Sequence, residues 1–236
     1  MIRSTILNIV LFLSSSVFVL FGVLFLGCSE AVVYKYWFCF SRMYSWIAKN
    51  IGGIDYKIEN PENMQVSGSV IYAIRHESMW ETLALIRLFE KPVFVMKKEL
   101  GEIPIFGLLA AKVHSIFVDR EQGAKALIDA SRKVTEALQD NRQVIIFPEG
   151  SRMPTGQYVP LKRGIALFYK KNNCQVIPVI HNSGKFWARR SFKKNTGTVT
   201  VKFMPPIPAG LPQDEFMERL DHIFHTEIEK LSQQEN

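Results

Sequence analysis

The sequence predicts an α/β fold, in which a mixed, largely parallel sheet is flanked by helices and preceded by an N-terminal membrane helix and an interfacial helix. Two observations lead to this prediction. Short β-rich runs alternate with segments of helical periodicity after residue 50, which is typical of parallel sheets with helical crossovers. A long uncharged stretch precedes them. The 236 residues are enough for one domain with a sizeable core.

The N-terminal stretch carries no charged residue from Ser4 to Ser29. Its apolar part, Ile6 to Leu26, reaches the length of about 20 residues that crosses a bilayer. A cleaved signal peptide is the alternative, and Leu26-Gly27-Cys28 resembles a lipoprotein cleavage site. We favour a retained membrane helix, because the apolar run exceeds the usual signal core of about 7 to 15 residues and Phe25 and Leu26 are bulky.

A second helix is expected directly after this span, up to about residue 50. Aromatic side chains alternate there with Lys35, Arg42 and Lys49, as at a membrane interface. The aromatic residues of this predicted belt are Tyr34, Tyr36, Trp37, Tyr44 and Trp46. Because more positive charge follows the span than precedes it, the globular part is expected to face the cytoplasm.

The rest of the chain alternates between strands and helices. The strands are predicted at about 69–74, 93–96, 115–118, 143–147, 175–180 and 198–203. Apolar residues recur at helical spacing between 122 and 140 and again between 216 and 231, which predicts two amphipathic helices. We find no internal repeat and no long linker.

Charge and cysteine content limit the possible partners. The net charge of +7 favours an anionic partner, which could be nucleic acid, an anionic membrane or an acidic substrate. On a chain with a membrane anchor, the basic aromatic stretch 185–194 favours anionic lipid headgroups, or an acidic carrier protein, over nucleic acid. Cys28, Cys39 and Cys174 are widely spaced, which indicates reduced thiols without a metal site or a disulfide framework.

A histidine and a carboxylate mark the end of the first strand of the globular part. His76 follows the apolar run, and Glu81 comes five residues later. On one helix the two would be about 140° apart, but with His76 on the turn and Glu81 in the first helical turn the carboxylate can reach the imidazole. That arrangement is a general base with its orienting partner. Alternatively, Ser78 to Glu81 is a capping box, with Ser78 as N-cap and Glu81 at N3.

A second strand ends in charged residues. The run that finishes at Phe147 is followed by Pro148-Glu149-Gly150-Ser151-Arg152. Because ligands gather at the carboxyl ends of parallel strands, the two strand ends are expected to converge. Neither Ser78 nor Ser151 lies in a G-x-S-x-G elbow, which disfavours a serine hydrolase.

Four segments together resemble the glycerolipid acyltransferase family, and most closely its bacterial lysophosphatidate acyltransferases. His76 to Glu81 is similar to H-x4-D, and Phe147 to Arg152 matches F-P-E-G-[ST]-R. Lys98 to Arg120 resembles the Lys-Glu-Leu…Ile-Pro-x-Phe-Gly block that runs into Asp-Arg, and Val176 to Val179 resembles the strand near V-I-P-V. The chain departs from this pattern at Glu81, where the family has aspartate; glutamate keeps the charge and adds one methylene.

The resemblance implies membrane anchoring by residues 1–50, an acyltransferase domain at 51–236, and acyl transfer from acyl-CoA or acyl carrier protein to lysophosphatidic acid. It implies His76 as general base, oriented by Glu81. Arg152 would bind the phosphate with Lys98 and Arg120 in support, and Glu149 would hold Arg152 or a glycerol hydroxyl. Gly150 and Ser151 would shape the turn. No metal or cofactor is implied, and the expected location is the cytoplasmic face of the inner membrane.

Two alternatives stay open. The acceptor could be another lysolipid, of an ornithine-type lipid or in lysophospholipid remodelling, or the chain could be a membrane-anchored basic binding protein without catalysis. The four remaining histidines lack a partner at suggestive spacing, and two of them, His222 and His225, are expected on a solvated helix face; the other two are His114 and His181.

Overall fold

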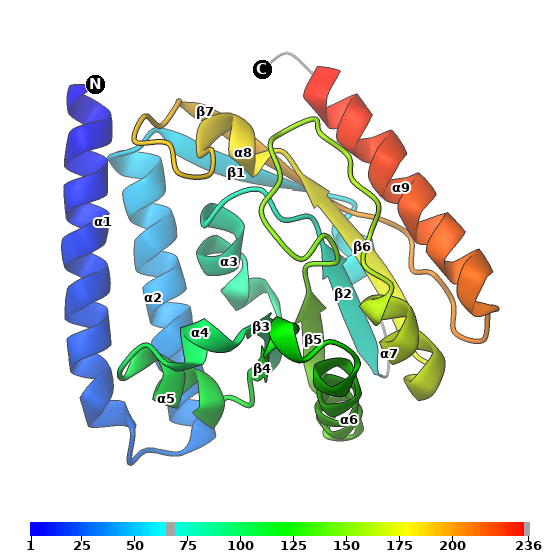
Figure 1. The fold of residues 1–236 in the computed structure, drawn as a ribbon. Helices are drawn as coiled ribbons and strands as arrows, with labels where there is room; N and C mark the ends of the chain where they lie inside the picture. The colour runs from blue at the N-terminus through cyan, green and yellow to red at the C-terminus, as the bar shows by residue number, and fades with distance from the viewer. Residues whose placement is uncertain (65–68, 234–236) are drawn as a thin grey trace.

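A seven-stranded sheet forms the centre of the computed structural model, which describes residues 1–64 and 69–233 (Figure 1). The strand order is β1-β7-β6-β2-β5-β3-β4. Every neighbouring pair is parallel except β6 and β7, which confirms the predicted mixed, largely parallel sheet. The strands are β1 (Ile54–Glu59), β2 (Val70–Ile74), β3 (Pro92–Lys97), β4 (Ile116–Val118), β5 (Gln143–Ile146), β6 (Gln175–His181) and β7 (Gly197–Phe203).

Strand β1 was not predicted. It alternates apolar with charged residues, and Asp, Lys and Glu are depleted in strands. It lies at the edge of the sheet, where it pairs only with β7, so its charged residues can stay in solvent. The other six strands fall where the sequence predicted them.

Helices cover both faces of the sheet. Strand β2 is buried on both sides: Val70, Tyr72 and Ile74 belong to one apolar core, and Ile71 and Ala73 to the other. The first core includes residues of α1 (Ile2–Phe21), α2 (Glu30–Asn50), α3 (Trp80–Ala84), η3 (Ile86–Leu88), α5 (Phe106–Lys112) and α8 (Ser183–Phe186). The second includes residues of α6 (Ala124–Gln139), α7 (Gly164–Asn172) and α9 (Gln213–Gln233). Helices α6 and α9 confirm the two predicted amphipathic helices. The remaining elements are α4 (Lys98–Gly101) and the short turns η1 (Gly22–Phe25), η2 (Pro61–Met64) and η4 (Arg120–Gln122).

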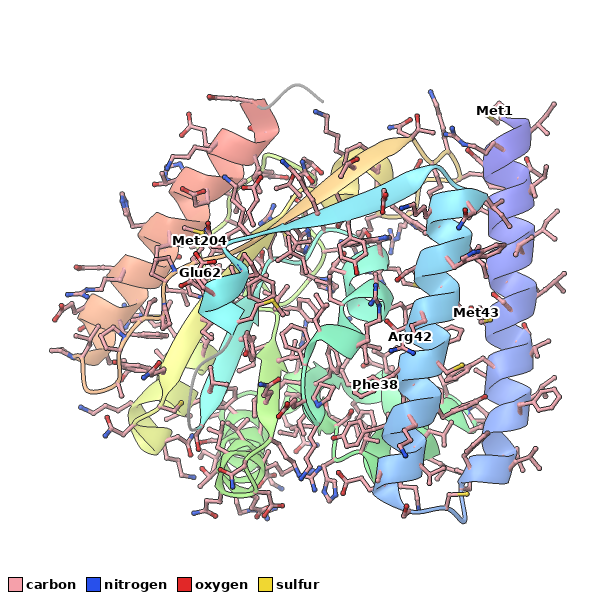
Figure 2. All side chains as sticks on the ribbon, turned by 180° about the vertical axis from the view of Figure 1, so that it is seen from behind. Met1, Phe38, Arg42, Met43, Glu62 and Met204 are labelled. Atoms are coloured by element: carbon pink, nitrogen blue, oxygen red, sulfur yellow. The ribbon has the colours of Figure 1, made fainter. Side chains whose placement is uncertain are left out.

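Helix α1 lies along the domain beside α2 (Figures 1 and 2). Together with η1 it is apolar and long enough to cross a membrane, by length and composition. Near its start Arg3 and Ser4 donate hydrogen bonds to the carbonyl of Lys194. At its end Gly22 packs so closely on α5 that a Cβ there would lie 2.6 Å from Leu109 Cδ1. The outward face remains apolar and exposed, and includes Ile6, Ile9, Phe12, Leu13, Val17, Leu20 and Phe21.

Most aromatic residues of α2 do not lie at an interface as predicted. Tyr34, Trp37 and Tyr44 are buried in the first core, because α2 lies between α1 and the sheet. Tyr44 stacks on Trp187 at 5.7 Å between ring centroids. Only Trp46 of the five expected aromatics is largely exposed, and Tyr36 is half-buried.

Candidate active site

The carboxyl ends of the parallel strands β2, β5, β3 and β6 lie at one edge of the sheet. His76 follows β2 and Phe147 follows β5, and their rings stack with centroids 4.2 Å apart. The sheet therefore brings together the two segments that the sequence singled out, as expected from their positions after parallel strands.

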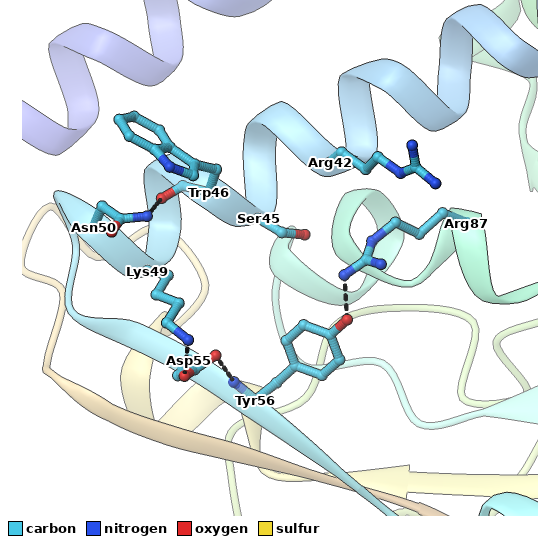
Figure 3. A pocket seen from close by; sticks show the side chains of 8 residues that line it. All are labelled: Arg42, Ser45, Trp46, Lys49, Asn50, Asp55, Tyr56 and Arg87. Carbon is cyan, nitrogen blue, oxygen red and sulfur yellow. Dashed lines mark hydrogen bonds and ion pairs between the residues drawn. The ribbon is translucent and has the colours of Figure 1, made fainter.

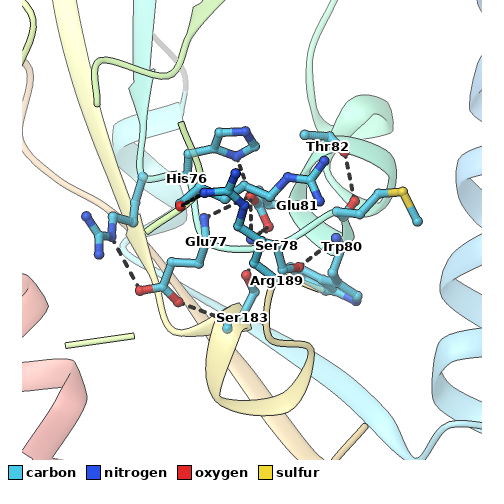
Figure 4. A network of polar contacts seen from close by, with 12 residues as sticks. His76, Glu77, Ser78, Trp80, Glu81, Thr82, Ser183 and Arg189 are labelled. Atoms are coloured by element: carbon cyan, nitrogen blue, oxygen red, sulfur yellow. Dashed lines mark hydrogen bonds and ion pairs between the residues drawn. The ribbon is translucent and has the colours of Figure 1, made fainter. Parts of the chain in front are cut away.

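His76 and Glu81 form a hydrogen-bonded pair. The distance from His76 Nδ1 to Glu81 Oε1 is 2.8 Å (Figure 4). Glu81 is in the first turn of α3 and His76 is on the preceding turn, as predicted. With Nδ1 held by the carboxylate, the other ring nitrogen, Nε2, points away from Glu81. A neutral imidazole that donates from Nδ1 keeps a lone pair on Nε2, so it can accept a proton there.

The Glu81 carboxylate is buried but well satisfied. It also accepts hydrogen bonds from the backbone N–H groups of Glu77 and Ser78 and from Ser183 Oγ. Burial alone would raise the pKa of Glu81, but the hydrogen bond to His76 and nearby positive charge outweigh it and lower the pKa to about 2. Glu81 is therefore a carboxylate at neutral pH.

The orienting contact of Glu81 is present, but the predicted capping box is only partly so, because Met79 rather than Ser78 is the N-cap of α3 and makes no side-chain capping hydrogen bond. Ser78 Oγ accepts from the backbone N–H of Trp80 at 2.7 Å, and Glu81 reaches back to the N–H of Ser78. Because a carboxylate has two oxygens with several acceptor sites, the same group accepts from backbone N–H groups just before α3 and holds His76.

A buried polar layer lies behind this pair, and we define it as Arg75, Glu77, Glu149 and His181. Arg75 is 0% exposed and pairs with Glu77 at 3.3 Å and with Glu149 at 3.0 Å. It also donates to the carbonyls of Pro154 and Gln157. Burial raises the pKa of Glu77 and of Glu149 to about 7, although the Arg75 charge opposes the shift.

The contacts of Glu149 contradict the role that the sequence predicted for it. The Glu149 carboxylate accepts from Arg75 and from the backbone N–H of His76 at 3.2 Å, and it neither bonds to Arg152 nor lines the cavity described below. Strand pairing places Glu149 behind the His76 turn, where it fixes the backbone. Arg75 and Glu77 were missed, although a charged residue on each side of a strand-end histidine was a usable signal.

His181 has partners that spacing did not reveal. Its Nε2 lies 2.6 Å from the carbonyl oxygen of Arg75, and its Nδ1 accepts from the N–H of Ser183. Complete burial lowers the pKa of His181 to about 4, so the ring is neutral at pH 7. The end of β6 therefore contacts the residue before His76 and helps to fix the His76 turn.

A cavity of about 690 Å³ opens in front of His76. One part is apolar, with walls that include Phe18, Trp37, Phe40, Ile103 and Phe106. The other part is lined by side chains that we call the cationic mouth: Lys97, Arg120, Arg152, Arg189 and Arg190. Of the described residues that line the cavity, none is acidic. An amphiphile with an anionic head fits this distribution.

The predicted phosphate residues divide into two groups. Arg152 and Arg120 line the cavity with Gly150 and Ser151. Arg120 donates to the carbonyl of Gly150, whose φ of +75° confirms the turn expected of this glycine. The prediction that Lys98 supports the phosphate is wrong. Lys98 begins α4, does not line the cavity, and pairs with Asp119 at 3.2 Å. Its neighbour Lys97, at the end of β3, lines the cavity instead.

Two further cations of the mouth come from the stretch 185–194. Arg189 and Arg190 line the cavity, and an Arg189 side-chain nitrogen (NH1) donates to the carbonyl of Arg152 at 3.1 Å. The sequence indicated a basic surface there but not its position beside His76. In the described residues no cluster of three or more His, Cys, Asp or Glu side chains could hold a metal ion.

Comparisons with known proteins match the chain to one family. The model of the acyltransferase family matches residues 55–182. A 1-acyl-sn-glycerol-3-phosphate acyltransferase of Pseudomonas aeruginosa is 34% identical over 71% of this chain and 65% of its own length. One of Helicobacter pylori is 28% identical over 65% of this chain and 68% of its own. The match with the Pseudomonas protein therefore spans less than two thirds of that relative.

A solved structure shares the fold. The 1-acyl-sn-glycerophosphate (LPA) acyltransferase of Thermotoga maritima superposes with a TM-score of 0.81 over 100% of this chain and 98% of the other, at 19% sequence identity. At that identity the likeness shows the fold, including the two N-terminal helices and the mixed sheet.

Proposed function

The chain belongs to the acyltransferase family, and from that premise we propose that it is a 1-acylglycerol-3-phosphate O-acyltransferase. It transfers a fatty acyl group from an acyl thioester to the 2-hydroxyl of lysophosphatidic acid, and the product is phosphatidic acid. The observation that carries this proposal is the position of the His76–Glu81 pair, between an apolar cavity and a cluster of cations. The relatives named above support the choice of substrate.

The reaction needs one general base. His76 Nε2 accepts the proton of the 2-hydroxyl while that oxygen attacks the thioester carbon, and Glu81 stabilises the imidazolium that forms. The tetrahedral intermediate then collapses, the C–S bond breaks, and the departing thiolate takes the proton from His76. No acyl-enzyme is needed, because the thioester is already activated. Base catalysis of this kind contributes about 10²–10⁴ in rate.

The acceptor's phosphate binds in the cationic mouth. Arg152 is the main ligand, because a guanidinium binds two phosphate oxygens through a planar fork. Lys97 and Arg120 support it from the ends of neighbouring strands. The fatty acyl chains occupy the apolar part of the cavity, between α1, α2 and α5.

The acyl donor is acyl-CoA or acyl carrier protein. Both present an acyl group on a phosphopantetheine arm, whose phosphate suits Arg189 and Arg190 at the exposed rim of the mouth. No metal or other cofactor takes part in the proposed reaction.

The outward apolar face of α1 anchors the protein to the cytoplasmic face of the inner membrane. Because α1 contacts the domain at both ends, this face holds the cavity at the lipid surface. Full-length protein should therefore stay with membranes through high-salt and alkaline washes. Its release by salt alone would show that only the basic surface holds it.

The direct test is a panel of acceptors offered to the purified protein in mixed micelles. Lysophosphatidic acid should turn over at least about tenfold faster than lysophosphatidylcholine or an ornithine lysolipid, because only a phosphomonoester satisfies the mouth. Each donor is tested with each acceptor, and His76→Ala is the inactive control. Equal rates for all acceptors would contradict the phosphate assignment, and transfer to none would favour a binding protein.

A further inference from the structure

A second cavity lies on another face of α2, away from His76. It has a volume of about 500 Å³, is open to solvent, and is bordered by α2, the start of β1 and η3 (Figure 3). It shares no lining residue with the catalytic cavity, which takes Tyr34, Trp37 and Phe40 from the same helix. The proposed reaction does not use it.

Positive side chains outnumber negative ones among the described residues that line this cavity. Lys49 and Asp55 pair at 2.7 Å at one end, so their charges compensate each other. At the other end lie Arg42, on α2, and Arg87, on η3. Two guanidinium charges therefore remain without an acid among the described residues that line the cavity.

Both arginines have unused donors. Arg42 makes no hydrogen bond or ion pair with any residue in the described ranges 1–64 and 69–233. Arg87 donates to Tyr56 Oη and lies over the Tyr56 ring, 5.7 Å from its centroid, which holds its guanidinium in place. Its Nε is buried and has no partner within those ranges. That nitrogen is out of reach of a ligand, but the terminal nitrogen NH1 of Arg87 also has no partner within those ranges and is not buried, so an anion at this end can accept from it and from Arg42.

The surroundings indicate that the anion belongs to a lipid. Trp46 lines the cavity and is 61% exposed, and Met43 on the same helix is exposed beside it. Figure 2 shows Met43 on the side of α2 that is toward α1 and Arg42 on the side away from α1. An exposed indole next to cations and an apolar helix is typical of the membrane–water interface.

We propose that this cavity is a second lipid-binding site, which takes the phosphomonoester headgroup of an anionic membrane lipid between Arg42 and Arg87, with Trp46 at its rim. A phosphomonoester carries a charge of about −1.5 to −2 at pH 7, which matches the two uncompensated guanidinium groups. A phosphodiester headgroup carries one charge less and offers fewer free oxygens, so it binds more weakly.

The four tryptophans provide a selective measurement. Trp37, Trp80 and Trp187 are 6%, 1% and 6% exposed, so acrylamide quenching of the tryptophan fluorescence reports mainly on Trp46. The full-length His76→Ala protein in non-ionic micelles is titrated with dihexanoyl phosphatidate, and turnover cannot interfere. The ligand should protect Trp46 from quenching, and Trp46→Phe should abolish the response.

The matched variants are Arg42→Gln and Lys35→Gln. Each removes one exposed cation from α2, but only Arg42 lines the cavity. Arg42→Gln should raise the apparent Kd at least about tenfold, because a charge-assisted contact is lost, and Lys35→Gln should change it less than about twofold. Arg152→Ala should leave the Trp46 response unchanged, which separates this site from the catalytic one. Melting temperatures check that each variant is folded.

Four results would overturn the proposal. Equal weakening by Arg42→Gln and Lys35→Gln would mean diffuse attraction to the helix surface. Equal protection by dihexanoyl phosphatidylglycerol would exclude selection of a monoester. Equal or stronger protection by inorganic phosphate or by coenzyme A would assign the cavity to a soluble phosphate. No protection by any of these ligands would show that no phosphate binds there. None of these results depends on whether the proposed transfer reaction occurs.

Discussion

The buried polar layer and the cationic mouth lie on opposite sides of His76 and hold their charges differently. In the layer Arg75 is completely buried and bonds to both Glu77 and Glu149, although Glu149 Oε2 has no hydrogen-bond partner among the described residues. In the mouth Lys97, Arg152 and Arg190 are exposed or half-buried, and their side chains make no hydrogen bond or ion pair with the described residues. The layer is therefore preorganised to fix His76, whereas the mouth keeps its donors available for a substrate that brings its own charge.

The largest effect on activity is expected at His76, which lies between the buried polar layer and the cationic mouth. His76→Ala should lower kcat by about 10²–10⁴, because the proposed base is lost. The chain should still fold, but with a lower melting temperature, because the buried Glu81 carboxylate loses its hydrogen bond to His76. Steady-state assays with lysophosphatidic acid measure kcat. A residual kcat within threefold of the native protein would remove His76 from the mechanism.

A substitution in the buried polar layer should lower the free energy of unfolding much more than a substitution in the cationic mouth. Arg75→Gln should destabilise the fold by about 3–5 kcal/mol, because it leaves buried carboxylates without their cation. Arg152→Gln, the matched change in the mouth, should stay within about 0.5 kcal/mol. Thermal unfolding in the same detergent compares the two. Similar melting temperatures for both variants would show that Arg75 is not the structural centre of the layer.

Acid should destabilise the fold through Glu81, the carboxylate that holds His76. Its pKa of about 2 in the folded chain lies below its ordinary value of 4.5, so between these pH values the unfolded chain binds a proton that the folded chain does not. Stability is therefore lost as the pH falls from 4.5 toward 2, by on the order of 3 kcal/mol.

The titrating groups of the buried polar layer change the stability mainly at higher pH. The pKa values of Glu77 and Glu149, about 7, add stability as the pH falls from 7 to 4.5, and the contribution of His181 is lost between pH 6.5 and 4. Melting temperatures between pH 6 and 3 should therefore show an acid slope at the low end, which Glu81→Gln makes shallower. An unchanged slope in Glu81→Gln would assign the acid sensitivity to another group.

Substitutions of Glu81 also test how strictly the base must be oriented. Glu81→Gln should lower kcat at least about tenfold, roughly 1.4 kcal/mol of transition-state stabilisation, because an amide cannot stabilise the imidazolium. Glu81→Asp keeps the charge and shortens the reach, so its kcat should fall between glutamine and the native residue. Near-normal turnover in Glu81→Gln would leave only the capping role.

The smallest effect is expected from a conservative change in the mouth. Arg152→Lys should raise the KM for lysophosphatidic acid severalfold and Arg152→Ala should raise it further, because lysine keeps the charge but loses the fork. Both should melt like the native protein. If neither changes KM or kcat, the phosphate binds elsewhere in the mouth.

Most of the fold was predictable because its signals are local. Runs of β-branched residues marked the inner strands, and apolar spacing marked α6 and α9. Strand β1 was missed because its charged residues suit a strand only at a sheet edge, and its edge position depends on β7, about 140 residues away. The aromatic residues of α2 were assigned to an interface because composition does not tell which helix will cover them.

The sequence by itself determined the His76–Glu81 pair, the Gly150 turn and the apolar N-terminal helix. These features depend on at most a few turns of backbone, whose geometry follows from residue type and spacing. Only the tertiary structure decided that Glu149 serves Arg75, that His181 holds the Arg75 carbonyl, and that Lys97 rather than Lys98 faces the cavity. Two of the partners of Arg75, Glu149 and His181, are 74 and 106 positions away. Lys97 and Lys98 are neighbours in the sequence, but Lys97 ends β3 and Lys98 begins α4. Such contacts are set by how the strands pair in the sheet, and no local pattern in the sequence records that pairing.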